Sequence, residues 1–482
     1  MIRRAVRLPT GNPWTAIASA AQLPRLTRSC AGDALAATKA SFNEQKDQPS
    51  PKLEHDLSLR RRAQPKKRGQ NQKNHKEPWH PIVHTPKPNP NAVKKLAFIP
   101  KRPEGPGGRL EFIGPNVDGN GVCRTVPAIW LRDSCQCMKC VHPVTRQREI
   151  DTFSIPSKII IIKADVTDDE IRVLFSDGHE STFKPEALVA RLSLDHEWSA
   201  RQGDHDPILW GYEIKEKPPM VDYDKVMASD EGVKEWTYLI KRYGFCYVDG
   251  CPVSPEATQE LLERISFIRY THYGGFWDFT ADMASNDTAY TNLGLDAHTD
   301  TTYFTDPARL QMFHLLSHEG GEGGASLLVD GFKVAMDLHK RNNAYYEVLS
   351  RFKSYGHASG NNGNSIFPLE PQPAFTHHGR QLVQIRWNNY DRDGLQPPVE
   401  SWPHWYMGAK KWNQLLKSPV NEYWEQLKPG RPLIFDNWRV LHGRSAFTGQ
   451  RRLCGGYING DDFLARYRSL NFPNNGLMHW QM

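Results

Sequence analysis

The stretch His298-Thr299-Asp300-Thr301-Thr302-Tyr303-Phe304 decides how this sequence is interpreted. A histidine and an aspartate stand two residues apart in it, so on a β-strand both side chains would leave the same face. With a second, distant histidine, such a pair forms the two-His-one-carboxylate triad of non-haem iron(II) oxygenases. The candidate third ligand is His442, within FDNWRVLHGR at residues 435–444. The alternative is a structural histidine beside a capping aspartate.

Length and charge bound the rest of the interpretation. A chain of 482 residues predicts two or three domains with sizeable cores. No apolar run approaches the ~18 residues of a membrane-spanning helix. Residues 1–100 carry 19 Lys or Arg and 6 Asp or Glu, so they contribute +13 to the net charge of +7 and leave −6 for the remainder. A basic nucleic-acid-binding domain is therefore not expected beyond residue 100.

The N-terminal region has two parts. Residues 1–32 are rich in arginine and small residues and have no acid, which is typical of a mitochondrial transit segment; a disordered basic start is the alternative. Residues 33–105 are rich in Pro, Lys, Gln and Asn and predict a disordered basic linker. Their basic clusters could mark a nuclear signal or an RNA contact, but no aromatic residues interleave with the charges. We therefore expect the mitochondrial matrix and no nucleic-acid partner.

A small β-rich module is expected over residues 106–200. Residues 128–133 are interpreted as a strand that leads into Cys135, Cys137 and Cys140, and residues 159–162 as a buried strand. Residues 171–176 and 179–183 flank Asp177-Gly178, a type I′ hairpin signal. Three thiolates spaced C-x-C-x-x-C need one more ligand to form a structural zinc site. We choose His179, with His142 as the local rival. The other five cysteines are scattered, which favours free thiols in a reducing compartment.

The larger domain is expected over residues 218–475. Ser254-Pro255-Glu256 predicts the start of a helix that runs to about Ile268, with a capping serine and a proline at its first position. After it come short strands, aromatic residues and glycine-rich turns, a pattern that favours a jelly roll or barrel. Helical inserts are expected near residues 332–350 and 405–416.

Several further stretches resemble the γ-butyrobetaine and trimethyllysine dioxygenases, which are 2-oxoglutarate-dependent iron oxygenases of carnitine biosynthesis. They are WLRDSCQC with a following Cys140, SDGH, THYGGFWDF, DTAYTNL, HTDTTYF, LLVDGF, IRWNNYDR, FDNWRVLHGR and RRLCGGYINGDD. The resemblance covers about residues 108–470. HTDTTYF, NNYDR and the Cys-Gly-Gly-Tyr run are more similar to the trimethyllysine branch. The fold implied is a mainly β protein with helical inserts: a distorted double-stranded β-helix (jelly roll) with a small zinc-binding N-terminal module.

The resemblance also implies ligands and roles. His298, Asp300 and His442 would hold Fe(II), and Arg451 would bind the distal carboxylate of the cosubstrate 2-oxoglutarate, because an arginine fork matches a carboxylate. Ascorbate would serve as reductant and zinc as a structural ion. Arg444 and Arg452, neighbours of this position, are expected to make structural pairs.

The substrate residues follow in the same way. The family's aromatic cage for a trimethylammonium group falls on four positions, and aromatic faces are what a quaternary ammonium requires: Tyr273, Trp277, Tyr290 and Tyr457. Asn388 has the family role of holding the substrate carboxylate. Asp287 and Asp391 stand where the butyrobetaine enzymes have neutral residues, so at least one of them is expected to bind the α-ammonium of trimethyllysine; a turn-capping aspartate is the alternative for each.

The implied reaction is hydroxylation of free Nε-trimethyllysine at C3 to 3-hydroxy-trimethyllysine, with succinate and CO2 formed, the first step of carnitine biosynthesis. Two alternatives are γ-butyrobetaine hydroxylation and a non-catalytic module that binds methylated lysine. A complete triad together with Arg451 argues against the latter, because a binding module needs neither. A small-molecule substrate is expected, with no membrane partner. A homodimer is compatible with the sequence.

Overall fold

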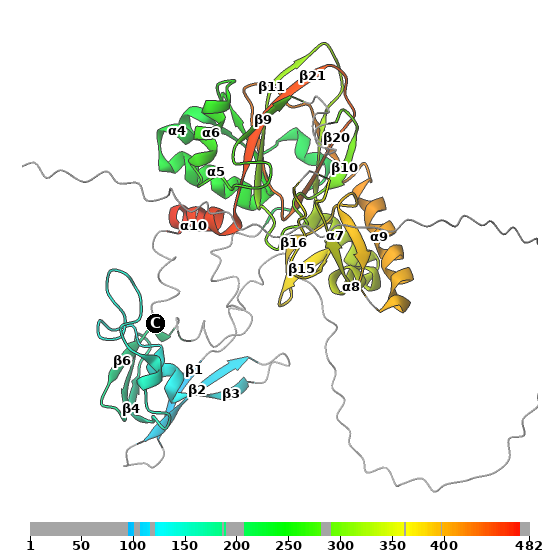
Figure 1. Ribbon diagram of the computed structural model, residues 1–482. Coiled ribbons are helices and arrows are strands. Elements are labelled where there is room, and N and C mark those ends of the chain that lie inside the picture. The colour runs from blue at the N-terminus through cyan, green and yellow to red at the C-terminus, as the bar shows by residue number, and fades with distance from the viewer. Residues whose placement is uncertain are drawn as a thin grey trace, which may run out of the picture. The chain divides into compact units, whose positions relative to one another are not determined.

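The computed structural model describes residues 95–100, 107–115, 121–185, 188, 207–280, 291–360, 363–396 and 398–472. The predicted transit segment and most of the predicted linker lie outside these ranges. Among the predicted site residues, Asp287 and Tyr290 also lie outside them. Figure 1 shows the two folded parts, which are described separately below.

The N-terminal part is an antiparallel sheet of six strands in the order β1-β2-β4-β5-β6, with β3 also paired to β2. The strands are β1 (Lys95–Pro100), β2 (Gly108–Pro115), β3 (Gly121–Val126), β4 (Ile161–Val166), β5 (Ile171–Phe175) and β6 (Glu180–Phe183). Buried side chains from β2, β4, β5 and β6, among them Leu110, Ile161, Val173 and Phe183, form its core.

Three expectations for this part were wrong. Residues 128–133 form a helix, α1 (Ala128–Asp133), after Pro127, rather than a strand, because a short apolar run does not distinguish the two. The predicted linker boundary at residue 105 is too late, since β1 pairs with β2 over Lys95–Pro100. The apolar residues of β1 form a short run flanked by lysines and a proline, so this segment does not stand out from the basic sequence before it. The buried strand expected at 159–162 begins only at Ile161.

The hairpin of β5 and β6 lies where it was predicted, but its turn is of another type. Gly178 has a φ of +79°, whereas Asp177 does not have positive φ, so the turn is not type I′. The Gly178 N–H donates to the carbonyl of Phe175 at 3.0 Å, and the Phe175 N–H donates to the carbonyl of His179 at 2.9 Å. This is a type I turn followed by a left-handed glycine, which sets the position of His179.

The larger part is a β-sandwich. One sheet has the order β7-β8-β19-β11-β21-β9 and the other β10-β20-β12-β18. The bounds are β7 (Met220–Asp222), β8 (Phe245–Asp249), β9 (Trp277–Thr280), β10 (Leu295–His298), β11 (Leu310–Glu319), β12 (Ser326–Asp330), β18 (Tyr423–Glu425), β19 (Leu433–Asp436), β20 (Val440–Arg444) and β21 (Gln450–Ile458). Side chains of both sheets meet in one core, including Phe245, Leu315, Leu328, Phe435 and Val440. The predicted jelly roll is confirmed.

Helices cover the outer faces of the sandwich (Figure 1). The helices α4 (Tyr223–Ala228), α5 (Asp230–Tyr243), α6 (Pro255–Glu263) and α10 (Gly460–Asn471) pack through residues such as Trp236 and Phe463 on the six-stranded sheet. The helices α7 (Gly331–Arg341), α8 (Asn343–Arg351) and α9 (Trp402–Leu416) pack through Trp412 on the other sheet and on the hairpin of β15 (Phe375–His378) and β16 (Gln381–Ile385). The strands β13 (Lys353–Gly356), β14 (Gln372–Pro373) and β17 (Arg392–Leu395) form a third small sheet.

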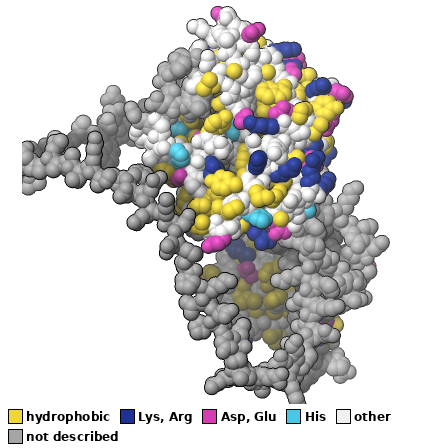
Figure 2. All heavy atoms as spheres, turned by 90° about the vertical axis from the view of Figure 1, so that its right-hand side faces the viewer, with side chains coloured by type: hydrophobic (Ala, Val, Ile, Leu, Met, Phe, Trp, Pro, Cys, Tyr) yellow, Lys and Arg dark blue, Asp and Glu magenta, His cyan; other side chains and the backbone are white. Residues whose placement is uncertain are grey.

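The predicted helical segments agree with this layout. Ser254 caps α6 by accepting from the N–H of Ala257 at 3.1 Å, although the helix ends at Glu263, earlier than expected. The insert expected near 332–350 is two helices, α7 and α8. Within the described residues no helix is long and apolar enough to cross a membrane. On the face shown in Figure 2, basic, acidic and hydrophobic side chains are interspersed.

Candidate active site

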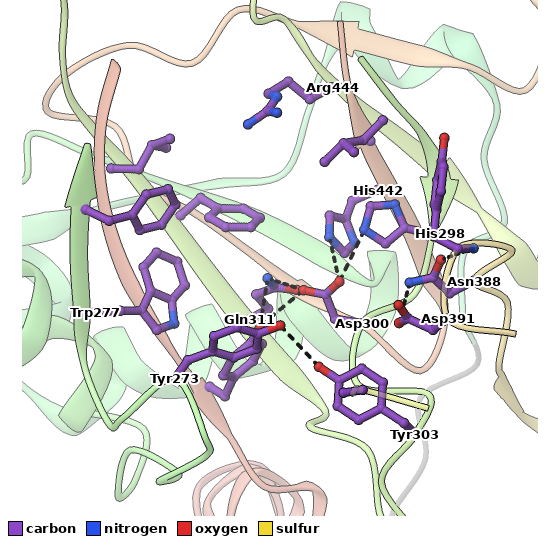
Figure 3. A pocket seen from close by; sticks show the side chains of 18 of the residues that line it. Tyr273, Trp277, His298, Asp300, Tyr303, Gln311, Asn388, Asp391, His442 and Arg444 are labelled. Atoms are coloured by element: carbon purple, nitrogen blue, oxygen red, sulfur yellow. Dashed lines mark hydrogen bonds and ion pairs between the residues drawn. The ribbon is translucent and has the colours of Figure 1, made fainter. Parts of the chain in front are cut away.

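The register of two strands brings the two predicted histidine ligands together. His298 is the last residue of β10 and pairs directly with His442 of β20. The Nε2 atoms of His298 and His442 lie 3.2 Å and 3.6 Å from Asp300 Oδ1. The ligand atoms of all three residues lie within 4.8 Å of one another, which fits a single metal ion (Figure 3). One expectation was wrong: β10 ends at His298, so Asp300 lies in the following loop and not on the strand.

Asn437, which sequence reasoning did not single out, holds this loop. Its side chain accepts from the Asp300 N–H at 2.7 Å and donates to the Asp300 carbonyl at 3.0 Å and the Ala308 carbonyl at 2.9 Å. The next residue, Thr301, has a φ of +57°, a strained conformation for a β-branched residue. Its hydroxyl accepts from the Ala308 N–H at 2.9 Å. The FDNW stretch thus fixes the backbone that carries the carboxylate.

Two members of the triad, His442 and Asp300, have protonation states that suit a divalent cation. Burial lowers the pKa of His298, but its hydrogen bond to the Asp300 carboxylate and the charge of that group outweigh burial and raise it. The His298 Nδ1 lies 2.7 Å from the carbonyl of Asp296, which fixes the ring with Nε2 towards Asp300. Burial and the neighbouring His298 lower the pKa of His442 to about 3, so it is neutral at pH 7. Burial opposes ionisation of Asp300, but His442, His298 and Gln311 outweigh it and hold the pKa of this carboxyl well below its usual range.

The triad faces a cavity of about 300 Å³. Its aromatic wall includes three predicted cage residues, Tyr273, Trp277 and Tyr457. The Trp277 ring lies 6.3 Å from Tyr457 and 5.4 Å from Phe313 between ring centroids. Phe279, Tyr303 and Phe313 also line the cavity, and the sequence did not assign any of the three to the site. Trp387 packs against the helical cluster.

Arg451 lies in the same cavity, and its side chain is 1% exposed. Its Nε and Nη1 have no hydrogen-bond partner among the described residues. Burial, with Arg444 nearby, lowers the pKa of Arg451 to about 10, so it is still a cation at pH 7. Gly324, with a φ of +71°, lies against the guanidinium, and a Cβ there would come within 3.1 Å of it. A buried cation with unpaired donors requires an anionic ligand.

The neighbouring arginines make other contacts, as expected. Arg452 forms an ion pair with Asp278 through Nε at 2.9 Å. Arg444 donates through Nη2 to the carbonyls of Thr291 at 2.7 Å and Leu293 at 3.0 Å. Arg452 is therefore occupied by Asp278, whereas Arg444 and Arg451 both line the cavity, and two donors of Arg451 have no partner there among the described residues.

Asn388 and Asp391 lie together at another side of the cavity. The Asn388 Nδ2 donates to Asp391 Oδ2 at 2.7 Å (Figure 3). An amide beside a carboxylate offers a donor for an anionic group and an acceptor for a cationic one. The pair therefore provides a polar end to a cavity whose opposite wall is aromatic.

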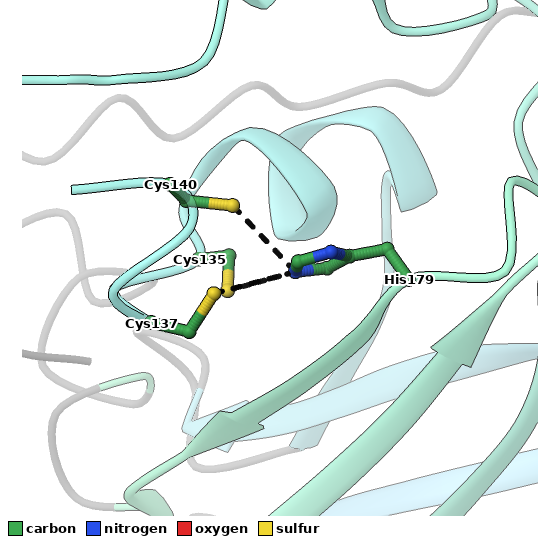
Figure 4. Close-up of side chains that lie close together, drawn as sticks. All are labelled: Cys135, Cys137, Cys140 and His179. Carbon is green, nitrogen blue, oxygen red and sulfur yellow. Dashed lines mark hydrogen bonds between the residues drawn. The ribbon is translucent and has the colours of Figure 1, made fainter.

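The three cysteines and His179 form a second cluster, in the N-terminal part (Figure 4). The Sγ atoms of Cys135, Cys137 and Cys140 lie 3.3, 3.7 and 3.6 Å from His179 Nε2. Tetrahedral zinc with bonds of about 2.3 Å to sulfur and 2.0–2.1 Å to nitrogen would place these atoms about 3.6 Å apart. The rival His142 instead accepts the N–H groups of Val144 and Thr145.

Comparisons with known proteins agree with this arrangement. The family model "Taurine catabolism dioxygenase TauD, TfdA family" matches residues 210–457, and "Gamma-butyrobetaine hydroxylase-like, N-terminal" matches residues 118–188. Trimethyllysine dioxygenase of Neurospora crassa is 46% identical over 407 residues, which cover 77% of this chain and 85% of that protein.

The chain belongs to the trimethyllysine dioxygenase family. Members depend on Fe(II) and 2-oxoglutarate. The mitochondrial trimethyllysine dioxygenase of Gallus gallus is 40% identical over 348 residues, covering 71% of this chain and 82% of that protein. A gamma-butyrobetaine dioxygenase of Pseudomonas sp. strain AK-1 is more distant, with 30% identity over 346 residues, 70% of this chain and 88% of that protein.

Proposed function

We propose that this chain hydroxylates free Nε-trimethyllysine at C3, with 2-oxoglutarate and O2 as cosubstrates, and forms 3-hydroxy-trimethyllysine, succinate and CO2. The observation that carries the proposal is the joint presence, in one cavity, of the His298–Asp300–His442 cluster, the buried Arg451 and an aromatic wall. A family whose relatives are named trimethyllysine dioxygenase supports the choice of substrate.

The triad would hold Fe(II). Two neutral imidazoles and one carboxylate are the ligand set of non-haem iron oxygenases and leave three positions open. Bound iron would supply oxygen activation coupled to decarboxylation of 2-oxoglutarate, with one oxygen atom passing to succinate and the other to the substrate carbon. Ascorbate would keep the iron reduced. The unpaired Nε and Nη1 of Arg451 support binding of the distal carboxylate of 2-oxoglutarate.

The aromatic wall would bind the trimethylammonium group. This cation has no N–H donor, so ring faces rather than oxygen atoms must recognise it. Tyr273, Trp277 and Tyr457 offer such faces in the cavity. Tyr290 is proposed as the fourth cage residue from the family resemblance alone.

The amino-acid end of the substrate would lie against Asn388 and Asp391. Their contact of 2.7 Å supports a shared site, in which Asn388 donates to the α-carboxylate and Asp391 accepts from the α-ammonium. Asp287 is the second candidate for the ammonium. Asp391→Thr and Asp287→Asn should be assayed on trimethyllysine and γ-butyrobetaine. One of them should lose trimethyllysine turnover selectively, by about 10-fold to 100-fold for a charged hydrogen bond. No shift in the ratio for either would exclude both.

Four further proposals concern the rest of the chain. Cys135, Cys137, Cys140 and His179 would bind a structural zinc ion that takes no part in the reaction. We keep the predicted division of the chain, with the start of the N-terminal module moved to residue 95. The parts are then residues 1–32, residues 33–94, a module from 95 to about 200, and a dioxygenase domain over 218–475. The mitochondrial relatives support a mitochondrial location, and we propose the matrix. A homodimer is retained as a hypothesis for sedimentation analysis.

Formation of succinate tests the proposal. Purified protein with Fe(II), ascorbate, 2-oxoglutarate and trimethyllysine should form succinate at a rate that depends on trimethyllysine. His298→Ala, Asp300→Ala and His442→Ala should each abolish it, because two ligands do not hold iron against water. Near-normal turnover with stoichiometric iron in any of the three would contradict the triad. A protein that binds trimethyllysine without forming succinate would be the non-catalytic binding module.

A further inference from the structure

The two oxygen atoms of Asp300 lie in different environments. Oδ1 faces the Nε2 atoms of His298 and His442, at 3.2 Å and 3.6 Å. Oδ2 faces away from them and accepts from Gln311 Nε2 at 2.8 Å and from the Tyr457 hydroxyl at 3.1 Å. Figure 3 shows the Gln311 amide pointing at the Asp300 carboxylate. One oxygen is thus placed for a metal ion, while the other is already occupied by two donors.

The two donors come from the rigid sheet and not from the loop that carries Asp300. Gln311 on β11 and Tyr457 on β21 are directly opposite in an antiparallel pair. Their side chains are 1% and 5% exposed. Gln311 Nε2 is also 3.5 Å from the Tyr457 hydroxyl, so the two donors are adjacent. Neither depends on a bound ligand for its position, since the strand register sets both.

The number of oxygen atoms through which Asp300 binds would determine how many positions on the ion remain open. When each residue of the triad binds through one atom, this ligand set leaves open the positions that 2-oxoglutarate and O2 would need on the ion. If Asp300 bound through both oxygens, it would occupy a fourth position, and one cosubstrate would lose its place. Two hydrogen bonds on Oδ2 oppose this, because moving Oδ2 to the metal would leave two buried donors unsatisfied.

We propose that Gln311 and Tyr457 are positioning residues that hold Asp300 as a one-oxygen ligand and thereby keep the third open position for O2. Tyr457 also joins this contact to the substrate site, since its ring lies 6.3 Å from Trp277 in the aromatic wall. A substrate cation against that ring is therefore one side chain away from the metal carboxylate. The inference rests on the proposed iron site.

Three variants separate this role from packing. Gln311→Leu removes the amide at nearly constant volume, and Tyr457→Phe removes the hydroxyl but keeps the ring that faces the substrate. Tyr423→Phe is the matched control, because its side chain is also buried, pairs with the Tyr247 hydroxyl at 3.4 Å and lies outside the cavity. Thermal unfolding of the metal-free proteins checks that each variant is folded. If only one of the two test variants folds, that variant alone is enough to test the inference.

Two quantities should be measured on the full chain. One is the affinity for Mn(II), a redox-inert probe, by calorimetry. The other is the ratio of succinate formed to trimethyllysine hydroxylated. Loss of a hydrogen bond to a metal ligand typically weakens metal binding by about 10-fold to 100-fold, and we expect this for both test variants. We also expect the ratio to rise above that of Tyr423→Phe, while Tyr457→Phe keeps its affinity for trimethyllysine.

Unchanged Mn(II) affinity and an unchanged ratio in Gln311→Leu and Tyr457→Phe would overturn the inference. His442→Ala distinguishes this failure from failure of the proposed function. If His442→Ala abolishes Mn(II) binding while the two test variants behave like the control, only the positioning role is wrong. If His442→Ala binds Mn(II) normally, the iron site itself is wrong, and the inference fails with it.

Discussion

His298 and His442 are cross-strand partners at the end of β10 and in β20, with ring centroids 4.3 Å apart. A shift of one residue in this pairing would turn one imidazole to the opposite face of the sheet. The register of two strands that are far apart in sequence therefore creates the metal cluster. The loop after β10, held by Asn437, then supplies the carboxylate.

Gly324 provides a test of the role of Arg451 that does not alter the arginine itself. A Cβ at Gly324 would come within 3.1 Å of the Arg451 guanidinium, whereas a Cβ at Gly320 would meet nothing within 4 Å. Both glycines have positive φ, +71° and +66°, so alanine costs about 1 kcal/mol of backbone strain at each. Gly324→Ala should raise the KM for 2-oxoglutarate severalfold, and Gly320→Ala should not. Equal KM values in steady-state assays would contradict the assignment of Arg451.

Trp277 should contribute to substrate binding and not to cosubstrate binding. Trp277→Ala should weaken trimethyllysine binding by roughly 1–2 kcal/mol, the range for a desolvated cation–π contact. Calorimetric titration with each ligand measures this directly. Comparable losses for trimethyllysine and 2-oxoglutarate would indicate that the indole packs the cavity instead.

The choice between His179 and His142 can be tested by metal analysis. Cys137→Ser and His179→Ala should lose zinc and lower the thermal midpoint of the N-terminal module, because structural zinc contributes folding free energy. His142→Ala is the control and should keep its zinc, since His142 caps its own turn. Zinc retained in His179→Ala but lost in His142→Ala would reverse the assignment.

Because His314 is buried in its neutral form, we expect the protein to lose stability in mild acid. His314 is 0% exposed; its Nε2 accepts from the Gly430 N–H at 3.0 Å, and its Nδ1 pairs with the Thr258 hydroxyl at 2.6 Å. Burial lowers the pKa of His314 to about 4. The unfolded chain, with a pKa of about 6.5, therefore binds more protons between these values, and stability falls as pH decreases through that window.

The expected loss in the free energy of unfolding is on the order of 2 kcal/mol between pH 7 and pH 5. Urea unfolding at the two pH values measures it. His314→Gln, which does not titrate, should show a smaller decrease than the unmutated chain. The same decrease in both proteins would assign the pH dependence to other groups, such as His377, whose pKa burial also lowers to about 4.

Local motifs in the sequence were sufficient for some parts of the structure. The hairpin at Asp177-Gly178, the cap at Ser254, the cysteine cluster and the His298–Asp300 pair were located from residue type and spacing, and the family resemblance supported His442 as the third ligand. The helix at 128–133 and the strand at 95–100 were missed, because short apolar segments take their structure from tertiary pairing rather than from local pattern.

The residues that support the metal ligands could not be predicted from local sequence patterns. Gln311 interrupts an apolar strand, LQMFHLL, and a polar residue there signals a buried contact, but its partner Asp300 is defined only by folding. Asn437 lies in FDNWRVLHGR, the same stretch as His442. Its hydrogen bonds to the backbone of Asp300, however, form only when a loop that is distant in sequence approaches it. The alternation of a strand indicates which side chains are buried but not which group they meet.

The most direct test of the proposed function is a competition between the two trimethylammonium substrates. Equimolar trimethyllysine and γ-butyrobetaine should be incubated together with the enzyme, Fe(II), ascorbate and 2-oxoglutarate, and both should be followed by mass spectrometry. We predict a gain of one oxygen atom on trimethyllysine, located at C3 by fragmentation, while γ-butyrobetaine remains mostly unmodified. Preferential oxidation of γ-butyrobetaine, or no oxygen gained by either compound, would contradict the proposed function.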